Sequence, residues 1–199
     1  KENYINDQTG LKGADRYDFK TTHQNNGRLR TFFSSGISYS GTNAFTLDAS
    51  NYTNPAVTNF LTGTYNLVNY DATVDDIRLD FLFKHHGQYA NANNRVWIRG
   101  NDDPGTPWIQ VYDLSANQSQ AGVFKRSASL EIGDMLIANN QNFSSSFQAR
   151  WGQEGVVMAS DNTRGNGYSF DDIQLYKAID DIQLLSIDEP VVIDCGLGS

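Results

Sequence analysis

The sequence is poor in cysteine, glutamate and long apolar runs, and each shortage excludes a class of protein. Its single cysteine, Cys195, cannot form a disulfide within the chain, which excludes a disulfide scaffold. No run of residues approaches the roughly 18 apolar positions that a membrane-spanning helix needs, so no membrane insertion is expected. Four glutamates stand against 19 aspartates. Because aspartate favours turns and glutamate favours helices, a helical bundle is also excluded.

The charge and the polar composition narrow the class further. The net charge of -8 at pH 7 repels a phosphate backbone, so nucleic acid is not an expected partner. Asn, Ser, Thr and Gly together make up 66 of the 199 residues, which is typical of turn-rich β proteins. The 39% of hydrophobic residues and 12% of aromatic residues are enough to fill one core. We therefore expect one full-sized β domain.

Apolar and polar residues alternate with a period of two along much of the chain, which predicts strands. The clearest strand covers residues 76–86, where every second residue from Ile77 to His85 shares one face. A hairpin is expected at 95–112, around an acidic turn with two prolines and two glycines. The other expected strands are 28–33, 44–48, 64–70, 122–130, 144–151 and 168–176, with short helical turns at 57–61 and 130–139. This pattern predicts an all-β fold, a jelly-roll (concanavalin-like) β-sandwich of two antiparallel sheets.

The sequence pattern changes near residue 180. Residues 181–187 fit one more strand, an Asp-Glu-Pro sequence at 188–190 ends it, and residues 191–199 fit the first strand of another unit. We therefore expect a sandwich module at 1–179, and a linker with the start of a following module at 180–199. Flanking domains of the same chain are then expected partners. No basic-then-apolar leader follows Lys1, so any export signal is expected outside this sequence.

The sequence carries no established catalytic motif. It lacks a Gly-x-Ser-x-Gly elbow, a His-Glu-x-x-His motif, a phosphate loop and a cysteine pair. His85 and His86 are adjacent in a strand and therefore point to opposite faces, which disfavours a shared metal. Glu131 and Glu154 are the remaining pair that fits an acid and a nucleophile for glycoside hydrolysis, but nothing in their surroundings marks a site. We therefore expect a non-catalytic protein and assign no catalytic residue.

The abundant acidic and amide oxygens suit a hard cation, since Ca²⁺ takes six to eight oxygen ligands. Asp171 and Asp172 are the sharpest candidates. Asp171 falls on the same side of its strand as the apolar residues that follow, and a buried carboxylate needs a cation or several donors. The candidate partners of this pair are Asp15, Asp18 and Asp48. Asp102 and Asp103 in the hairpin loop are a second candidate site. For Asp171 and Asp172, the alternative interpretation is an exposed acidic strand edge without a metal.

Aromatic residues of the hairpin offer a possible ligand site. Trp97 and Arg99 share one face of their strand, and Trp108 and Tyr112 are expected to share one face of the next strand. An aromatic surface beside polar groups is suited to bind sugars, whose ring faces stack on aromatic rings. Apolar residues also occupy the other face of both strands, so two central strands of the core fit the pattern as well.

Several of these segments together resemble a known family. The stretches 77–87, 94–100, 108–114, 143–155 and 167–173, with Thr-Leu-Asp at 46–48, are similar to the jelly-roll modules of large surface proteins from Bacteroidetes. Such modules resemble MAM domains and the cleaved-adhesin domains of gingipain-type proteases. The resemblance covers residues 28–177, and Cys-Gly-Leu-Gly at 195–198 looks like the start of an Ig-like module. The paired cysteines of eukaryotic MAM domains are absent, which favours the bacterial comparison.

The resemblance implies a secreted, cell-surface β-sandwich, stabilised by calcium, in a multidomain adhesin or gliding-motility protein outside the bacterial outer membrane. The family's Phe-Asp-Asp-Ile motif maps onto Asp171 and Asp172, and its strand-end aspartate maps onto Asp48. The expected function on this basis is non-catalytic adhesion to a surface ligand or glycan. An accessory domain that positions a secreted protease or glycosidase is the alternative, because these modules accompany adhesins and enzymes alike.

Overall fold

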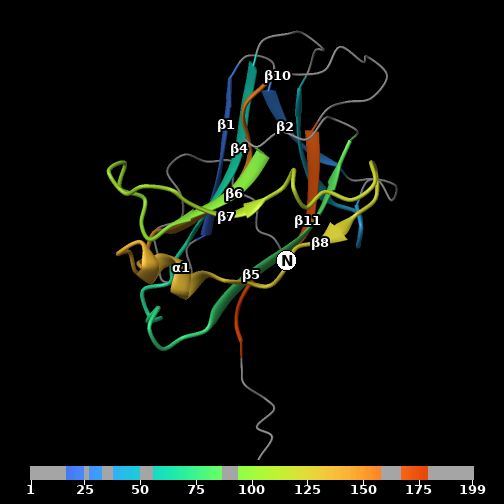
Figure 1. Ribbon diagram of the computed structural model, residues 1–199. Helices are drawn as coiled ribbons and strands as arrows, with labels where there is room; N and C mark the ends of the chain where they lie inside the picture. Colours follow the sequence, from blue (N-terminus) through green and yellow to red (C-terminus); the bar gives the residue numbers. More distant parts are fainter. Residues whose placement is uncertain are drawn as a thin grey trace, which may run out of the picture.

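The computed structural model describes residues 17–24, 27–32, 38–49, 56–86, 94–157 and 167–178, most of them in β-strands (Figure 1). For 17–24, 27–32, 48–49, 56–57 and 154–157 it describes the backbone. The strands are β1 (Tyr17–Gln24), β2 (Gly27–Phe32), β3 (Ala44–Ala49), β4 (Ala56–Tyr65), β5 (Ile77–His85), β6 (Asn94–Arg99), β7 (Ile109–Asp113), β8 (Lys125–Arg126), β9 (Leu130–Glu131), β10 (Phe147–Val157) and β11 (Gly167–Lys177). The helix α1 (Ile132–Ala138) follows β9 directly.

The strands form two antiparallel sheets that pack face to face. Sheet A has the order β1-β4-β10-β6-β7, and sheet B has the order β2-β3-β11-β5-β8, with β9 paired to β5. The ring of Phe81 in sheet B meets two rings of sheet A, Trp151 at 6.2 Å and Tyr112 at 5.5 Å between centroids. The predicted jelly-roll β-sandwich is therefore confirmed.

The core is built from the alternation that the sequence shows most clearly. In β5, the side chains from Ile77 to Phe83 at every second position are buried and belong to the core cluster. In β10, Phe147, Ala149 and Trp151 face them and are fully buried. Each fully buried large apolar side chain contributes about 1.5–3 kcal/mol, so these two strands supply much of the stability of the sandwich.

Two predicted elements differ in the structure. Residues 56–65 form the long strand β4, where the sequence predicted a helical turn at 57–61 and a strand at 64–70. The core-facing positions of β4 include Asn59 and Gly63, which mask the apolar alternation. A Cβ added at Gly63 would lie 2.6 Å from the hydroxyl oxygen of Tyr65, so a larger residue there would displace the Tyr65 ring. The predicted strand at 122–130 consists of the two-residue strands β8 and β9, and Gly122 in the preceding turn has a φ of +78°.

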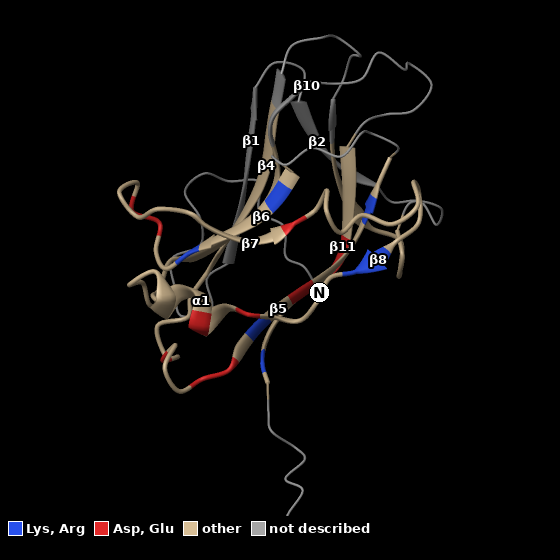
Figure 2. Cartoon of the chain, in the orientation of Figure 1, with Lys and Arg blue, Asp and Glu red and all other residues tan. Residues whose placement is uncertain are grey.

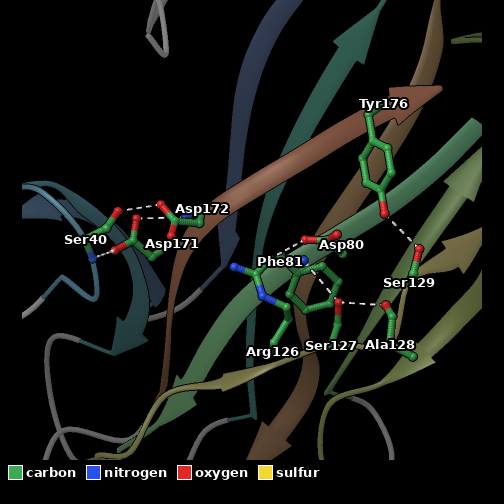
Figure 3. Close-up of polar contacts among 10 residues, drawn as sticks. All are labelled: Ser40, Asp80, Phe81, Arg126, Ser127, Ala128, Ser129, Asp171, Asp172 and Tyr176. Carbon is green, nitrogen blue, oxygen red and sulfur yellow. Dashed lines mark hydrogen bonds and ion pairs between the residues drawn. The ribbon is translucent and has the colours of Figure 1, made fainter. Parts of the chain in front are cut away.

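Polar contacts fasten the short strands to sheet B (Figure 3). The Arg126 guanidinium donates to Asp80 at 2.6 Å, and the Ser127 hydroxyl accepts from the backbone N–H of Phe81 at 3.0 Å. The hydroxyl groups of Ser129 and Tyr176 form a hydrogen bond of 2.9 Å. Figure 2 shows this pairing of charge as blue on β8 beside red on β5.

Two other expectations from the sequence concern the segment at 180–199 and membrane insertion. The predicted linker and second module at 180–199 fall outside the described residues. Within the described ranges no helix has the length and apolar character to cross a membrane.

Candidate functional site

The outer face of sheet A carries aromatic and arginine side chains side by side, and we call this set the platform. Strand pairing aligns it in rows across the sheet. Arg150 of β10 is opposite Trp97 of β6, which is in turn opposite Gln110 of β7. Two residues away along each strand, Gln148 is opposite Arg99. The platform consists of Phe60, Thr62, Thr64, Arg95, Trp97, Arg99, Trp108, Gln110, Gln148 and Arg150.

Arg150 lies at the centre of the platform and covers its rings. The central guanidinium carbon is 4.2 Å from the ring centroid of Phe60, 4.5 Å from that of Trp97 and 4.2 Å from that of Trp108. Phe60 and Trp97 pack edge to face beneath it, and they are 6% and 8% exposed. Cation–π contacts of this kind stabilise by about 0.5–2 kcal/mol each. The outermost layer of the platform is therefore made of arginine, Trp108 and amide side chains, which are half-buried or exposed.

Arg99 ties the platform to the loop at residues 100–107. Its Nε donates to Gln148 at 2.7 Å, while Nη1 and Nη2 donate to the backbone carbonyls of Asp103 and Asp102 at 2.9 and 3.2 Å. Its guanidinium also stacks 4.5 Å from the Trp108 ring centroid. Burial lowers the pKa of Arg99, and the nearby carboxylates of Asp102 and Asp103 act in the opposite direction. One side chain thus fixes both the loop and Trp108.

The loop itself is held by a network of short hydrogen bonds. The Asn101 side chain accepts from the backbone N–H of Asp103 at 2.9 Å and from the Thr106 hydroxyl at 2.7 Å. Asp103 accepts from the N–H of Gly105 at 2.8 Å, and Gln141 donates to the carbonyl of Pro107 at 2.9 Å. A loop fixed in this way loses little conformational entropy when a ligand binds beside it.

Tyr112 is not part of the platform, so the prediction that it shares a face with Trp108 is wrong. A bulge in β7 is the reason: Gln110 pairs with Trp97, but Tyr112 pairs with Val96, which faces the core. The Tyr112 ring packs edge to face on Phe81 at 5.5 Å, and this burial raises the pKa of its hydroxyl group. The other three predicted ligand-binding residues, Trp97, Arg99 and Trp108, do lie together.

Asp171 and Asp172 lie at a bulge in β11 and fasten the segment at 38–43 (Figure 3). Asp171 is 7% exposed, and its carboxylate accepts from the backbone N–H groups of Tyr39 at 2.6 Å, Ser40 at 3.1 Å and Asp172 at 2.8 Å. The Ser40 hydroxyl donates to Asp172 at 2.6 Å. Asp172 has a φ of +43°, which is uncommon for a residue with a side chain.

The prediction that Asp171 is buried is confirmed, but the prediction that it faces the core is wrong. The bulge places two residues of β11, Asp172 and Ile173, against one residue of β5, between the pairs Asp171–Leu82 and Gln174–Asp80. Tyr168 and Phe170 before the bulge face the core, so Asp171 lies on the outer side of sheet B. Its burial there is accompanied by three backbone donors, as a buried carboxylate requires.

The strand register separates two of the predicted calcium ligands. Asp48 of β3 is opposite Gly167, which is four residues from Asp171 along β11, or about 13 Å at the strand rise. Two carboxylates on one Ca²⁺ each lie about 2.3–2.6 Å from the ion, so the grouping of Asp48 with Asp171 in one site is wrong. The side chain of Asp48 is outside the described part of the chain.

The described side chains contain no cluster of three or more His, Cys, Asp or Glu residues suited to a metal ion. The second predicted pair, Asp102 and Asp103, is exposed at the tip of the hairpin. Calcium binding at either aspartate pair therefore stays a prediction. Glu131, at the start of α1, lies 3.7 Å from Arg78 on sheet B, while the backbone of Glu154 belongs to sheet A. Nothing described brings these two glutamates together.

Most platform residues were not predicted as ligand-binding from the sequence, among them Phe60, Gln148 and Arg150. Gln148 and Arg150 alternate with the buried Ala149 and Trp151, so their exposure to the outer face was readable from the period of two. Their position beside β6 depends on strand pairing across about 50 residues of sequence, which alternation alone does not indicate.

Comparison with known proteins shows the fold. No family model and no curated protein matches the chain. Among solved structures, the chain is similar to a module studied for "the promiscuous specificity of the carbohydrate-binding modules from the beta-sandwich super family", with a TM-score of 0.50 and 11% identity over 86% of this chain and 60% of that one. It is also similar to the enzymatically active domain of tailspike protein 4 of bacteriophage CBA120, with a TM-score of 0.45 and 10% identity over 81% of this chain. A third is the CBM22-1 xylan-binding domain of Paenibacillus barcinonensis Xyn10C, with a TM-score of 0.43 and 12% identity over 79% of this chain and 85% of that one.

Of these three likenesses, the first supports the β-sandwich architecture, and at such low identity it shows the fold alone. This chain spans 60% of that carbohydrate-binding structure and 19% of the tailspike structure.

Proposed function

We propose that the chain is a non-catalytic module that binds a glycan on the platform. The observation that carries this proposal is the stacked arrangement of Arg99, Trp108 and Arg150 on the outer face of sheet A. Indole rings stack on sugar rings, and planar guanidinium groups donate hydrogen bonds to sugar hydroxyls. The fold supports the proposal, because the β-sandwich to which the chain is similar is a carbohydrate-binding module.

Trp108 is the ring best placed to contact a sugar. Trp97 and Phe60 are buried, whereas Trp108 is half-buried and lies directly before β7 beside the fixed loop. The guanidinium groups of Arg99 and Arg150 also contact its ring, so a sugar would meet the part of the ring that they leave exposed. Gln110 is exposed in the neighbouring row and offers both a donor and an acceptor. Because Arg99 and the loop hold Trp108 in place before a ligand arrives, binding costs little ordering of the protein.

In its cellular setting, this module belongs to a large secreted multidomain protein and serves adhesion at the cell surface. That part of the proposal rests on the sequence resemblance to MAM-like and cleaved-adhesin-like modules of Bacteroidetes surface proteins. Glycan binding by an accessory domain of a secreted hydrolase is the alternative setting, because it uses the same platform in a different parent protein.

A glycan array tests the proposal directly. We expect the wild-type protein to bind a subset of immobilised glycans, and Trp108→Ala to lose that binding while its melting curve still shows a folded protein. Tyr39→Ala is the matched control, since Tyr39 is 61% exposed beside sheet B and outside the platform. Equal binding by wild type and Trp108→Ala, or no binding to any glycan, would contradict the proposal.

A further inference from the structure

A row of polar side chains crosses the inner face of sheet A next to the apolar core. Gln153 of β10 is opposite Asn59 of β4 on one side and opposite Asn94 of β6 on the other. All three residues are at most 1% exposed. The neighbouring row, two residues away along each strand, contains Trp151 and belongs to the apolar core. The interior of the sandwich therefore includes a polar layer that is closed to bulk solvent.

Three buried atoms in and beside this layer have no hydrogen-bond partner in the described parts of the chain. They are Nε2 of Gln153, Oδ1 of Asn94 and Nε1 of Trp151. Trp151 and Gln153 are two residues apart on the same face of β10, and Asn94 is opposite Gln153, so the three side chains are neighbours. A buried donor or acceptor that stays unpaired is destabilising, and nearly all such groups in folded proteins bond to protein or to ordered water.

We infer that this layer is a binding site for ordered water, held by Trp151, Gln153 and Asn94. A ligand here must accept from the N–H groups of Trp151 and Gln153 and donate to the amide oxygen of Asn94. Water does both, and buried waters typically make about three such bonds. A metal cation cannot accept from an N–H group, and a simple anion cannot donate to an oxygen. The burial of the three residues also excludes a glycan, so this site is separate from the platform on the opposite face of sheet A.

The water site adjoins a hydrogen-bonded link between the two sheets. Asn94 Nδ2 donates to the hydroxyl group of Tyr168 in β11 at 3.3 Å, and that hydroxyl donates to Gln118 at 3.3 Å. Asn94 thus directs its amide nitrogen to sheet B and offers its oxygen to the water. The pairing of β10 with β4 is interrupted directly after Gln153, so a water bound there connects β10 to this link where its regular ladder ends.

A crystal structure of the wild-type protein tests the inference directly. We expect electron density for a water oxygen at about 2.7–3.2 Å from at least two of the three atoms. Density for a metal ion or a larger molecule would overturn the assignment to water. Protein groups bonded to all three atoms, or no density beside any of them, would overturn the site itself.

NMR spectroscopy tests the site in solution, because the indole N–H of Trp151 reports on its neighbour. A long-lived buried water should give this N–H cross-peaks with the water signal that have opposite signs in NOE and ROE spectra, whereas proton exchange gives equal signs. Gln153→Met should weaken or remove these cross-peaks, because methionine keeps the length of the side chain and has no N–H donor.

The matched control is Gln174→Met, the same change at an exposed position of β11, which should leave the cross-peaks of Trp151 unchanged. Wild-type spectra without these cross-peaks would overturn the inference, as would full cross-peaks in Gln153→Met. The wild-type crystal and spectra decide the question even if Gln153→Met does not fold.

Discussion

The carboxylate of Asp171 is expected to be a major stabilising group outside the core, and its replacement tests how the segment at 38–43 is held. In Asp171→Ala, the backbone donors of Tyr39, Ser40 and Asp172 lose their acceptor. Hydrogen bonds to charged groups contribute about 1.5–3 kcal/mol each. Tyr39 and Ser40 are exposed, so their N–H groups recover part of this free energy by binding water.

We therefore expect Asp171→Ala to lower the free energy of unfolding by about 2–4 kcal/mol. For a domain of this size that corresponds to a fall in melting temperature of about 5–15 °C. Urea unfolding followed by circular dichroism measures the change. We also expect Asp171→Asn to be destabilising, because one acceptor oxygen becomes an amide group that faces a backbone donor.

Asp102→Asn is the matched control, because it makes the same change in charge at an exposed position whose side chain is remote from β11. It should alter the free energy of unfolding by less than about 0.5 kcal/mol. If Asp171→Ala and Asp171→Asn unfold at the same urea concentration as the wild type, the three hydrogen bonds do not stabilise the fold as we argue.

Four further predictions address the platform, the sheet, the metal and the pH dependence. Trp97→Ala should lower the free energy of unfolding by about 3–5 kcal/mol, since a buried indole is removed; a change below about 1 kcal/mol in thermal or urea unfolding would count against burial of this ring. Gly152→Ala should destabilise by about 1–3 kcal/mol, because the new Cβ would lie 2.2 Å from the carbonyl oxygen of Asn59 at a φ of +155°; wild-type stability would contradict the close approach. If the paired aspartates of β11 bind Ca²⁺, EGTA should lower the melting temperature, and Ca²⁺ but not Mg²⁺ should restore it. At a hundredfold excess over Kd, bound Ca²⁺ should add about 2.7 kcal/mol to the free energy of unfolding. Superimposable melting curves with Ca²⁺ and with EGTA would end that hypothesis. The hydrogen bond from Lys177 lowers the pKa of Asp75 below 3.8, with a further contribution from a backbone N–H. The pair therefore stabilises the fold above that pH, and this stabilisation is lost as the pH falls through the lowered pKa. Asp75→Asn should flatten the loss of stability at acid pH in pH-dependent unfolding, and an unchanged loss would refute the assignment.

The sequence predicted the fold where alternation was uninterrupted. In β5, the positions from Ile77 to Phe83 are apolar on the core side, and the structure confirms both the strand and its inward face. The hairpin of β6 and β7 was predicted for the same local reason, and a short helical turn was expected at 130–139, where α1 lies. Strand β4 was missed because Asn59 and Gly63 occupy core-facing positions, so its period of two is not visible as apolar alternation.

The candidate site was predictable in part. Two bulges account for most of the difference between the predicted and the observed positions of its residues. Each bulge adds one residue and moves the following side chains to the other face. The bulge in β7 moves Tyr112 into the core, and the bulge in β11 places Asp171 on the outer side of its sheet. The position of Arg150 over Trp97 follows from pairing between strands far apart in the sequence, which residue spacing does not reveal.

The three tryptophans provide the most direct measurement of the central claim, that a glycan binds on the outer face of sheet A. Trp108 and Trp97 belong to the platform, and Trp151 is fully buried on the inner face of the same sheet. We would record the indole N–H signals by two-dimensional ¹H–¹⁵N NMR during titration with a glycan retained on the array, after assigning each signal by a tryptophan-to-phenylalanine variant. We expect the largest shift for Trp108, a smaller shift for Trp97 and none for Trp151. Saturable binding that leaves the Trp108 signal unchanged would show that the glycan binds elsewhere and would contradict the account.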